Sequence, residues 1–309
     1  MITMYKTTER GLETIPEVSR GCWIDVIDPS TEEVRELLEL GIPQEFITYP
    51  LDLDERARVE REDGEVLIVL RVPLYQGQAA DVPYTTMPLG VILDSQWILT
   101  ISRRPSEVMQ EFAAGRVRGL STAKRNRFIL QLLHQTASKY LSYLREINKA
   151  VDLLEDQLQQ STRNKELLGL LKYQKSLVYF TEALRSNELM MERLQRGQFF
   201  TTYPDDEDLL EDALTENQQA IAMTGIATDI LSSTMDAFAS IISNNVNIVM
   251  KFLAAATIIL MVPNILSSLW GMNVPVPMTN WPWAFPAIIA ISLVLALLVA
   301  RIFIRRDWF

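Results

Sequence analysis

The side chains of this 309-residue sequence that could do chemistry together lie toward its C-terminus, in and beside a stretch without charge. Residues 252–300 contain no Asp, Glu, Lys, Arg or His. On a helical wheel of 100° per residue, polar and thioether side chains around the first half of this stretch fall in one arc of roughly 100°. Amide and hydroxyl oxygens of this kind could bind the water shell of a hard cation. The members of the stripe are Asn247, Met250, Ala254, Thr257, Met261, Asn264 and Ser268, with Leu253 at its edge.

Two interpretations of this stripe stay open. Polar groups are costly in lipid, so the stripe must face protein or water. Small and polar residues commonly line helix interfaces in membranes, which favours plain helix packing. The other interpretation is a pore, and two helices per chain cannot enclose an aqueous path. A pore therefore requires several copies around one axis, as a homo-oligomer.

The elements that must position the stripe are two transmembrane helices. A bilayer core needs about 20 apolar residues per helical crossing, so the uncharged stretch holds two, at roughly residues 249–270 and 283–304. We expect residues 249–309 to form the membrane domain and a short cytosolic tail. Lys251 lies at the start of the first span, and Arg301, Arg305 and Arg306 lie at the end of the second. By the positive-inside rule both termini are cytosolic, which predicts a multi-pass protein of the cell (inner) membrane in contact with the lipid bilayer.

Residues 1–120 are predicted to form an N-terminal cytosolic α/β domain. Ser30 and Glu33 have the spacing of a capping box, which marks the start of a helix. The aliphatic run 66–70 predicts a buried central strand, and residues 90–93 and 97–101 predict a hairpin.

Residues 121–248 are predicted to form a cytosolic stalk of long helices. Apolar residues alternate at spacings of three and four from Tyr140 and again from Tyr173, which predicts two antiparallel helices joined by a polar turn at 159–163. A third helix begins near Pro204 and meets no proline before Pro263, so it is predicted to run directly into the first span. The expected fold class is an α+β cytosolic domain (α/β/α) with a long helical stalk, followed by two transmembrane α-helices.

The formal charge of −10 is concentrated in one segment. Residues 197–250 contain no Lys or Arg against nine acids, and the rest of the chain is close to neutral. Nucleic acid is therefore not an expected partner, whereas a divalent cation is. Asp205, Asp208 and Asp212 are candidate ligands of a regulatory cation, because stalk helices brought together in an oligomer would set carboxylates near one another. The alternative is that the acids only favour the helix N-terminus.

Enzyme chemistry finds no support in this sequence. One cysteine, Cys22, cannot form an intramolecular disulfide and is expected in the core, and one histidine, His134, is expected to be structural or solvated. We find no nucleophile beside a base, no glycine-rich phosphate loop and no cluster of metal-ligand spacing. No cofactor is expected.

The first predicted span ends in Trp270-Gly271-Met272-Asn273, and Pro263 lies eight residues before the glycine. With a short outer loop, a last span and a basic tail ending in an aromatic residue, this pattern resembles the CorA family of divalent metal ion transporters. The likeness covers the whole chain. The family's first strand and helix are similar to Trp23-Ile24-Asp25 followed by Asp28-Pro29-Ser30. Its stretch before the next strand is similar to residues 54–60. The resemblance implies a pentamer with a cytosolic α/β/α funnel, a stalk helix that continues as the pore helix, and passage of Mg²⁺, often also of Co²⁺ and Ni²⁺.

The resemblance also implies roles for single residues. Gly271, Met272 and Asn273 match the selectivity filter, with Asn273 as its asparagine at the outer mouth. Asp212 matches a regulatory acid of the stalk, whereas Gln76 stands where some members have the acidic partner, so the regulatory cation site is expected to be rebuilt or weakened. The outer loop 274–282 lacks the carboxylate that members frequently carry. The positions that match pore-lining residues are Asn247, Met250, Leu253, Met261 and Asn264.

The function expected is a channel or transporter that passes Mg²⁺ inward down its electrochemical gradient and is gated by cytosolic divalent cation. Mg²⁺ is thus both the transported and the regulatory ion. One alternative is a zinc transporter of the same architecture, against which Met272 and the poverty in His and Cys argue. The other alternative is a membrane-anchored coiled-coil scaffold, which would not need Asn247 and Asn264 in the stripe.

Overall fold

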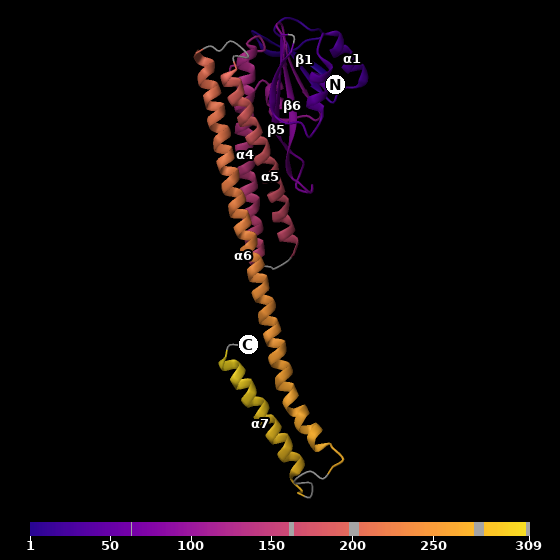
Figure 1. Ribbon diagram of the computed structural model, residues 1–309, viewed down its shortest axis with the longest axis vertical. Helices are drawn as coiled ribbons and strands as arrows, with labels where there is room; N and C mark the ends of the chain where they lie inside the picture. Colours follow the sequence, from indigo (N-terminus) through magenta and orange to yellow (C-terminus); the bar gives the residue numbers. More distant parts are fainter. Residues whose placement is uncertain (63, 161–163, 198–203, 275–280, 307–309) are drawn as a thin grey trace. The chain divides into compact units, whose positions relative to one another are not determined.

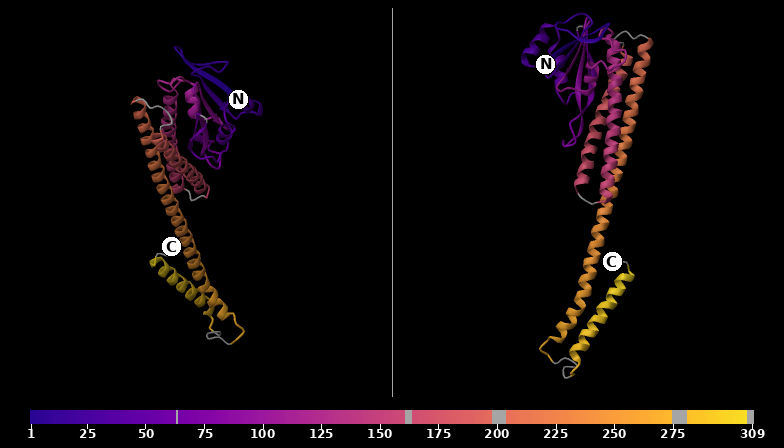
Figure 2. Two further views of the ribbon diagram at one scale, coloured as in Figure 1. Left: turned by 45° about the horizontal axis from the view of Figure 1, so that its top comes forward. Right: turned by 180° about the vertical axis from the view of Figure 1, so that it is seen from behind.

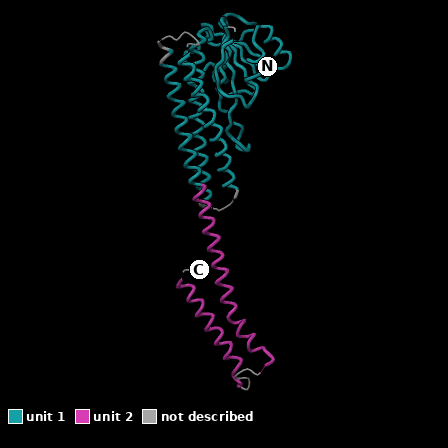
Figure 3. Tube along the Cα trace, viewed as in Figure 1, with its two compact units in different colours: residues 1–234 teal, residues 235–309 magenta. Residues whose placement is uncertain are grey.

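The computed structural model describes residues 1–62, 64–160, 164–197, 204–274 and 281–306 (Figure 1). Its contacts divide the chain into two compact units, residues 1–234 and 235–309 (Figure 3). One helix, α6 (Pro204–Trp270), belongs to both units. The predicted long helix that continues into the first apolar span is therefore confirmed.

The first unit is built on a seven-stranded sheet. Its order is β2-β1-β3-β7-β6-β5-β4, and every neighbouring pair is antiparallel except β3 and β7. The predicted strand at 66–70 lies inside β5, between β4 and β6, and the predicted hairpin is the β6–β7 pair. The strands are β1 (Ile2–Thr8), β2 (Gly11–Thr14), β3 (Trp23–Ile27), β4 (Arg58–Glu62), β5 (Glu65–Tyr75), β6 (Tyr84–Leu93) and β7 (Ile98–Ser102).

Helices cover both faces of this sheet. Successive residues of β5 alternate between two hydrophobic clusters, because strand side chains point to opposite faces. One cluster contains α1 (Thr31–Glu39), α2 (Gln44–Thr48) and the edge of η1 (Tyr49–Leu51), together with the fully buried Cys22. The other contains α3 (Glu107–Ala113), α4 (Arg125–Gln160), α5 (Asn164–Arg196) and the first part of α6. The three layers confirm the expected α/β/α arrangement.

Local signals position these helices as the sequence predicts. The Ser30 hydroxyl accepts from the Glu33 backbone N–H at 3.2 Å, and the Glu33 carboxylate accepts from the Ser30 N–H at 2.8 Å, so the capping box is formed.

On the sheet, Gly90 of β6 lets Pro50 approach closely, because an added Cβ would lie 2.2 Å from the proline Cγ.

The long helices α4, α5 and the first part of α6 lie side by side in all views (Figure 2). Residues at the predicted heptad spacings, such as Tyr140, Leu144 and Phe180, are fully buried. Gly169 of α5 lets the two helices approach, since a Cβ there would meet Leu154 of α4 at 3.0 Å. α4 ends at Gln160 and α5 begins at Asn164, so most of the predicted turn lies outside the described residues.

The second unit contains the end of α6 and helix α7 (Ala284–Arg305). Both helices are long and apolar enough to cross a membrane. α6 ends at Trp270, as predicted for the first span, and α7 is shifted by one residue from the predicted second span. Pro263 is accommodated inside α6.

A buried carboxyl lies in the first unit, on β3. Asp25 is 7% exposed, and its Oδ1 accepts a hydrogen bond from the Thr100 hydroxyl at 2.8 Å. The same hydroxyl oxygen accepts from the Trp23 indole N–H at 2.8 Å, so Thr100 joins the two residues. Burial raises the pKa of Asp25 to about 6, although the Thr100 hydrogen bond acts in the opposite direction. The folded state therefore favours the protonated acid, and the charged form destabilises the fold above about pH 6.

We expect Asp25→Asn to stabilise the protein at pH 8, because it removes the buried charge and keeps an acceptor for Thr100. The gain is at most about 3 kcal/mol, the equivalent of a shift of about two pKa units. The difference in stability between Asp25→Asn and the wild type should narrow as the pH falls through 6 toward 5, because the native carboxyl then gains its proton. Thermal unfolding followed by circular dichroism at pH 8 and pH 5 measures this. Asp28→Asn, the same substitution at an exposed position, is the control, and an equal difference between Asp25→Asn and the wild type at both pH values would contradict the expectation.

Candidate functional site

The predicted stripe lies on α6 and is exposed along its whole length in the single chain. We call these residues the polar face of α6. Its largest apolar members, Met250, Leu253 and Met261, are 60%, 52% and 54% exposed. The Thr257 hydroxyl donates to the Leu253 carbonyl at 2.8 Å, which satisfies its proton within the helix. The polar face consists of Asn247, Met250, Leu253, Ala254, Thr257, Met261, Asn264 and Ser268.

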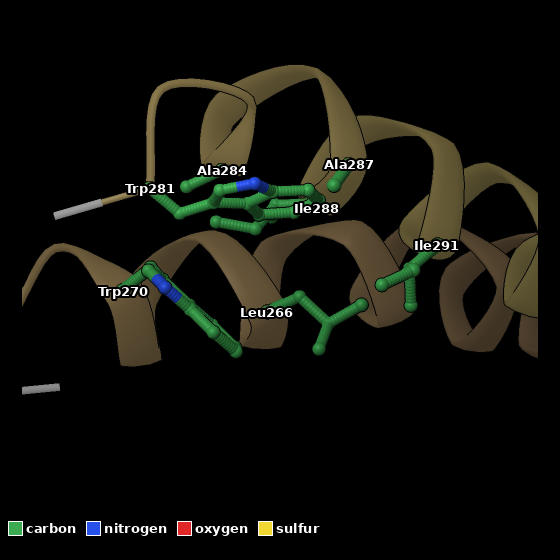
Figure 4. Close-up of a pocket in the computed structure, with 7 residues that line it drawn as sticks. All are labelled: Leu266, Trp270, Trp281, Ala284, Ala287, Ile288 and Ile291. Atoms are coloured by element: carbon green, nitrogen blue, oxygen red, sulfur yellow. The ribbon is translucent and has the colours of Figure 1, made fainter. Parts of the chain in front are cut away.

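The other side of α6 meets α7. Ala255 is fully buried, and Ile259 and Leu266 are less exposed than the polar face. Figure 4 shows Leu266 and Trp270 of α6 opposite Trp281 and side chains of α7, around a cavity of about 230 Å³. On the helical wheel this side and the polar face are on roughly opposite sides of α6. The cavity is lined by Leu266, Trp270, Trp281, Ala284, Ala287, Ile288 and Ile291.

The position of α7 bears on the two interpretations of the stripe, which were helix packing and a pore. Packing against the second span of the same chain does not explain the polar face, because α7 covers the opposite side. Amide and hydroxyl groups at membrane depth must meet protein or water. The polar face therefore has to be covered by other copies of the chain, by water, or by both.

The tripeptide Gly271, Met272 and Asn273 follows directly on the end of α6. The Gly271 N–H donates to the Ser267 carbonyl at 2.9 Å and closes the last turn of the helix. A Cβ at Gly271 would lie 3.2 Å from that carbonyl oxygen, which is tighter than ordinary contact. Met272 and Asn273 are exposed among the described residues. Asn273 thus follows the end of α6 by three residues.

The predicted regulatory acids lie at the other end of α6. Asp208 and Asp212 are exposed, one turn apart, whereas the side chain of Asp205 lies outside the described residues. Asp206, which the sequence did not single out, is buried with its Oδ1 3.9 Å from Arg127 Nη1. Within the part of one chain that the structure describes, no three His, Cys, Asp or Glu side chains come together as a metal site. A cation at Asp208 and Asp212 would need ligands from another copy or from water.

Gln76 is engaged elsewhere in the first unit. Its Oε1 accepts from Arg104 Nη1 at 3.0 Å, and its amide donates to the Val82 carbonyl at 3.3 Å. Asp81, in the same loop, is exposed. The Gln76 side-chain amide is therefore held by an arginine and a backbone carbonyl.

Sequence reasoning also missed a contact between a histidine and a carboxylate of the stalk. His134 Nε2 of α4 lies 3.4 Å from Glu216 Oε1 of α6. The two residues are far apart in the sequence, so only the packing of α4 on α6 brings them together. His134 is half-buried, between the structural and the solvated role expected for it.

An α/β unit, one long helix that continues into an apolar span, and a polar face that the second apolar helix leaves open are features expected of a membrane transport protein. The chain belongs to the family described as CorA-like Mg²⁺ transporter proteins, whose family model matches residues 19–306. This is a family of transporters, not of enzymes.

Relatives match this chain along nearly its whole length. It is 29% identical to the cobalt/magnesium transport protein CorA of Methanocaldococcus jannaschii, and all of both chains is covered. It is 22% identical to the protein of the same name from Thermotoga maritima, over 98% of this chain and 88% of that one. The complete structure of the CorA magnesium transporter from M. jannaschii matches with a TM-score of 0.86 at 25% identity, covering 100% of this chain and 99% of the other. The expected fold, an α/β domain, a long helix and two C-terminal apolar helices, is thus confirmed.

We expect the double variant Asn247→Leu, Asn264→Leu to lose most ion flux, because both substitutions replace amides of the polar face with apolar groups. Assembly should persist, since neither residue packs against α7. Flux into proteoliposomes and the oligomeric state in detergent measure the two effects. The control is Asn244→Leu, a neighbouring asparagine outside the polar face. A membrane anchor without a pore would keep its activity in the double variant.

Proposed function

We propose that this protein is a channel that passes Mg²⁺ inward across the inner membrane, and Co²⁺ and Ni²⁺ with it. Several copies, five by resemblance to the family, place their polar faces around one axis, and both termini are cytosolic. The observation that carries this proposal is the position of the polar face, opposite the side of α6 that α7 covers. The names of the relatives, which are cobalt/magnesium transport proteins, support the choice of ion.

In this proposal the mouth of the pore is a ring of Asn273 amides on the turn made by Gly271 and Met272. Mg²⁺ dehydrates reluctantly and prefers octahedral oxygen ligands. A ring of side-chain carbonyls would select the ion by accepting hydrogen bonds from its water shell, without stripping it. The outer loop carries no carboxylate, so neutral amides provide the recognition at the mouth.

Below the mouth, polar and apolar rings alternate along the polar face. Asn264, Thr257 and Asn247, with Ser268 near the mouth, would hydrogen-bond the water around the ion. Rings of Met250, Leu253 and Met261 would form a constriction that closes by dewetting. A gate of this kind needs only a small change in radius, because a narrow apolar pore empties of water.

The driving force is the electrochemical gradient. A divalent ion gains about 4.6 kcal/mol on crossing an inside-negative potential of 100 mV, twice the value for one charge. The sequence contains no nucleotide-binding motif that could add to it. Flux into proteoliposomes under an imposed potential, with Mg²⁺, Co²⁺, Ni²⁺ and Zn²⁺ compared, tests the proposal. Preference for Zn²⁺ would favour the alternative of a zinc transporter, and uptake without potential or gradient would contradict a channel.

We expect Asn273→Ala to reduce Mg²⁺ flux at least about tenfold, the effect of losing about 1.4 kcal/mol of ion stabilisation at the mouth. Asn273 is exposed in the single chain, so the variant should assemble normally. Initial rates of Mg²⁺ uptake, with Asn244→Ala as the control, measure the effect. An alanine variant with the wild-type rate and ion preference would show that the filter lies elsewhere.

Cytosolic Mg²⁺ is proposed to gate the channel through the acids of the stalk. In the oligomer, carboxylates of neighbouring α6 helices would repel one another unless a divalent cation lies between them. Bound Mg²⁺ would stabilise a symmetric closed state, and its loss would let the helices separate and the constriction widen. This coupling requires that Mg²⁺ binds the closed state more tightly than the open one. Asp212 is the first candidate, with Asp208 one turn away and Asp205 next.

Asp212→Asn should leave the channel more open at high internal Mg²⁺, because one proposed ligand loses its charge. Under the same conditions the stalk should be cut faster by trypsin. Flux and limited proteolysis over a range of Mg²⁺ concentrations measure both effects, and Asp236→Asn, further along the same helix, is the control. If the triple variant with Asn at 205, 208 and 212 keeps the Mg²⁺ dependence of the wild type, the acids only favour the helix N-terminus.

A further inference from the structure

The contact between α4 and α6 contains the chain's one histidine. His134 Nε2 lies 3.4 Å from Glu216 Oε1, and the Ser138 hydroxyl, one turn further along α4, donates to the other oxygen of the same carboxylate. Both oxygens of Glu216 are therefore held by α4. The side chains of His134 and Glu216 are 29% and 30% exposed, so protons can reach them from the solvent.

The charged groups around this contact come from each packed helix. On α6, the exposed Asp212 precedes Glu216 by one turn. On α4, Lys139 is held by Glu107 and Glu111 of α3, at 2.6 and 3.6 Å. From α5, the Leu184 carbonyl accepts a hydrogen bond from the Asn217 side-chain amide of α6 at 3.0 Å, which is a neutral contact. A positive charge on His134 would therefore face the Glu216 carboxylate, with a further acid one turn away.

We propose that His134 and Glu216 form a proton-sensitive clasp between α4 and α6. Histidine is the side chain whose charge ordinarily changes between pH 5 and 8. The protonated imidazole forms a charge-assisted contact with the carboxylate, which is stronger than the neutral hydrogen bond that remains after deprotonation. A more acidic cytosol therefore holds α6 more firmly against α4.

The consequence for transport rests on the proposed function, in which separation of the α6 helices opens the channel. Because α6 is one helix from Pro204 to Trp270, a clasp at Glu216 restrains the same helix that carries the polar face. Protons then favour the closed state, as bound Mg²⁺ does. Protonation would act at Glu216 and Mg²⁺ binding at Asp212, which are one helical turn apart on α6.

The test uses the full-length protein in proteoliposomes, with fixed free Mg²⁺ inside, an imposed potential, and internal pH varied from 8 to 6. We expect wild-type flux to fall about two- to fivefold over this range, the effect of one partly exposed ion pair per subunit. His134→Gln, which cannot be protonated, should stay at the pH 8 level throughout. His134→Lys, which keeps its charge, should stay at the low level throughout.

A matched control removes the other ion pair between α4 and α6. Arg127 Nη1 lies 3.9 Å from Asp206 Oδ1, and arginine keeps its charge over this pH range. Arg127→Gln should therefore retain the pH slope of the wild type, whatever its absolute flux. Glu216→Gln removes the carboxylate instead of the imidazole and should flatten the slope as His134→Gln does.

Limited proteolysis of the protein in detergent at pH 6 and pH 8 provides a readout that does not depend on transport. The wild type should be cut more slowly at pH 6, and His134→Gln and Glu216→Gln should lose most of that difference. The same pH dependence in the wild type and in both variants, in flux and in proteolysis, would overturn the clasp. Absence of Mg²⁺ flux in every protein, with the proteolysis difference intact, would contradict the channel and leave the clasp standing.

Discussion

The absence of water from a bilayer core is the constraint on which the rest of this structure depends. A chain can cross that core only where its backbone groups bond to one another, which is why both crossings are helices. The same constraint applies to side chains. Asn264 and Thr257 lie in a stretch without any charged residue, yet they share one side of α6, and α7 covers the other side. In the single chain the Thr257 hydroxyl donates to its own helix, and the polar face as a whole stays exposed, so its environment in lipid has to come from outside this pair of helices.

The first unit packs against the first part of the helix that continues into the apolar span. The sheet and the helices α4 and α5 share one hydrophobic cluster with Leu210, Ala213 and Leu214 of α6. A hydrogen bond also aligns α6 with α5, because the side-chain amide of the buried Asn217 donates to the Leu184 carbonyl. Ligand binding or protonation in this region therefore acts on a helix whose position is already defined by packing. The proposed gating would act through this packed part of the helix.

Patterns with a short period were enough to predict much of this fold. The run 66–70, the heptads that contain Tyr140 and Phe180, and the capping box at Ser30 each depend on local spacing, and the structure confirms them. The stripe on α6 is of the same kind, since a wheel projection needs only one helix. Its role in conduction, and that of Asn273, stays a prediction.

Contacts between distant segments could not be predicted in this way. The parallel pairing of β3 with β7, the burial of Asp25 beside Thr100, and the contact of His134 with Glu216 depend on how whole layers pack. Which side of α6 would meet α7 also depended on packing, because Phe252, Ile259 and Leu266 could equally have faced lipid. Gln76 differs from these cases, because its hydrogen bond from Arg104 is seen in the structure, whereas its effect on a regulatory cation site stays a prediction.

The unbroken length of α6 has a mechanical consequence. At a rise of 1.5 Å per residue, the 31 residues from Glu216 to Asn247 span roughly 46 Å, so this part of the helix is a lever arm. A tilt of only about 3° at Glu216 would displace the far end by roughly 2.5 Å, close to the diameter of a water molecule. Small rotations near Glu216 would thus become changes on the scale of one hydration layer near Asn247. The displacement would grow with distance along the helix, and the force available there would fall in the same proportion.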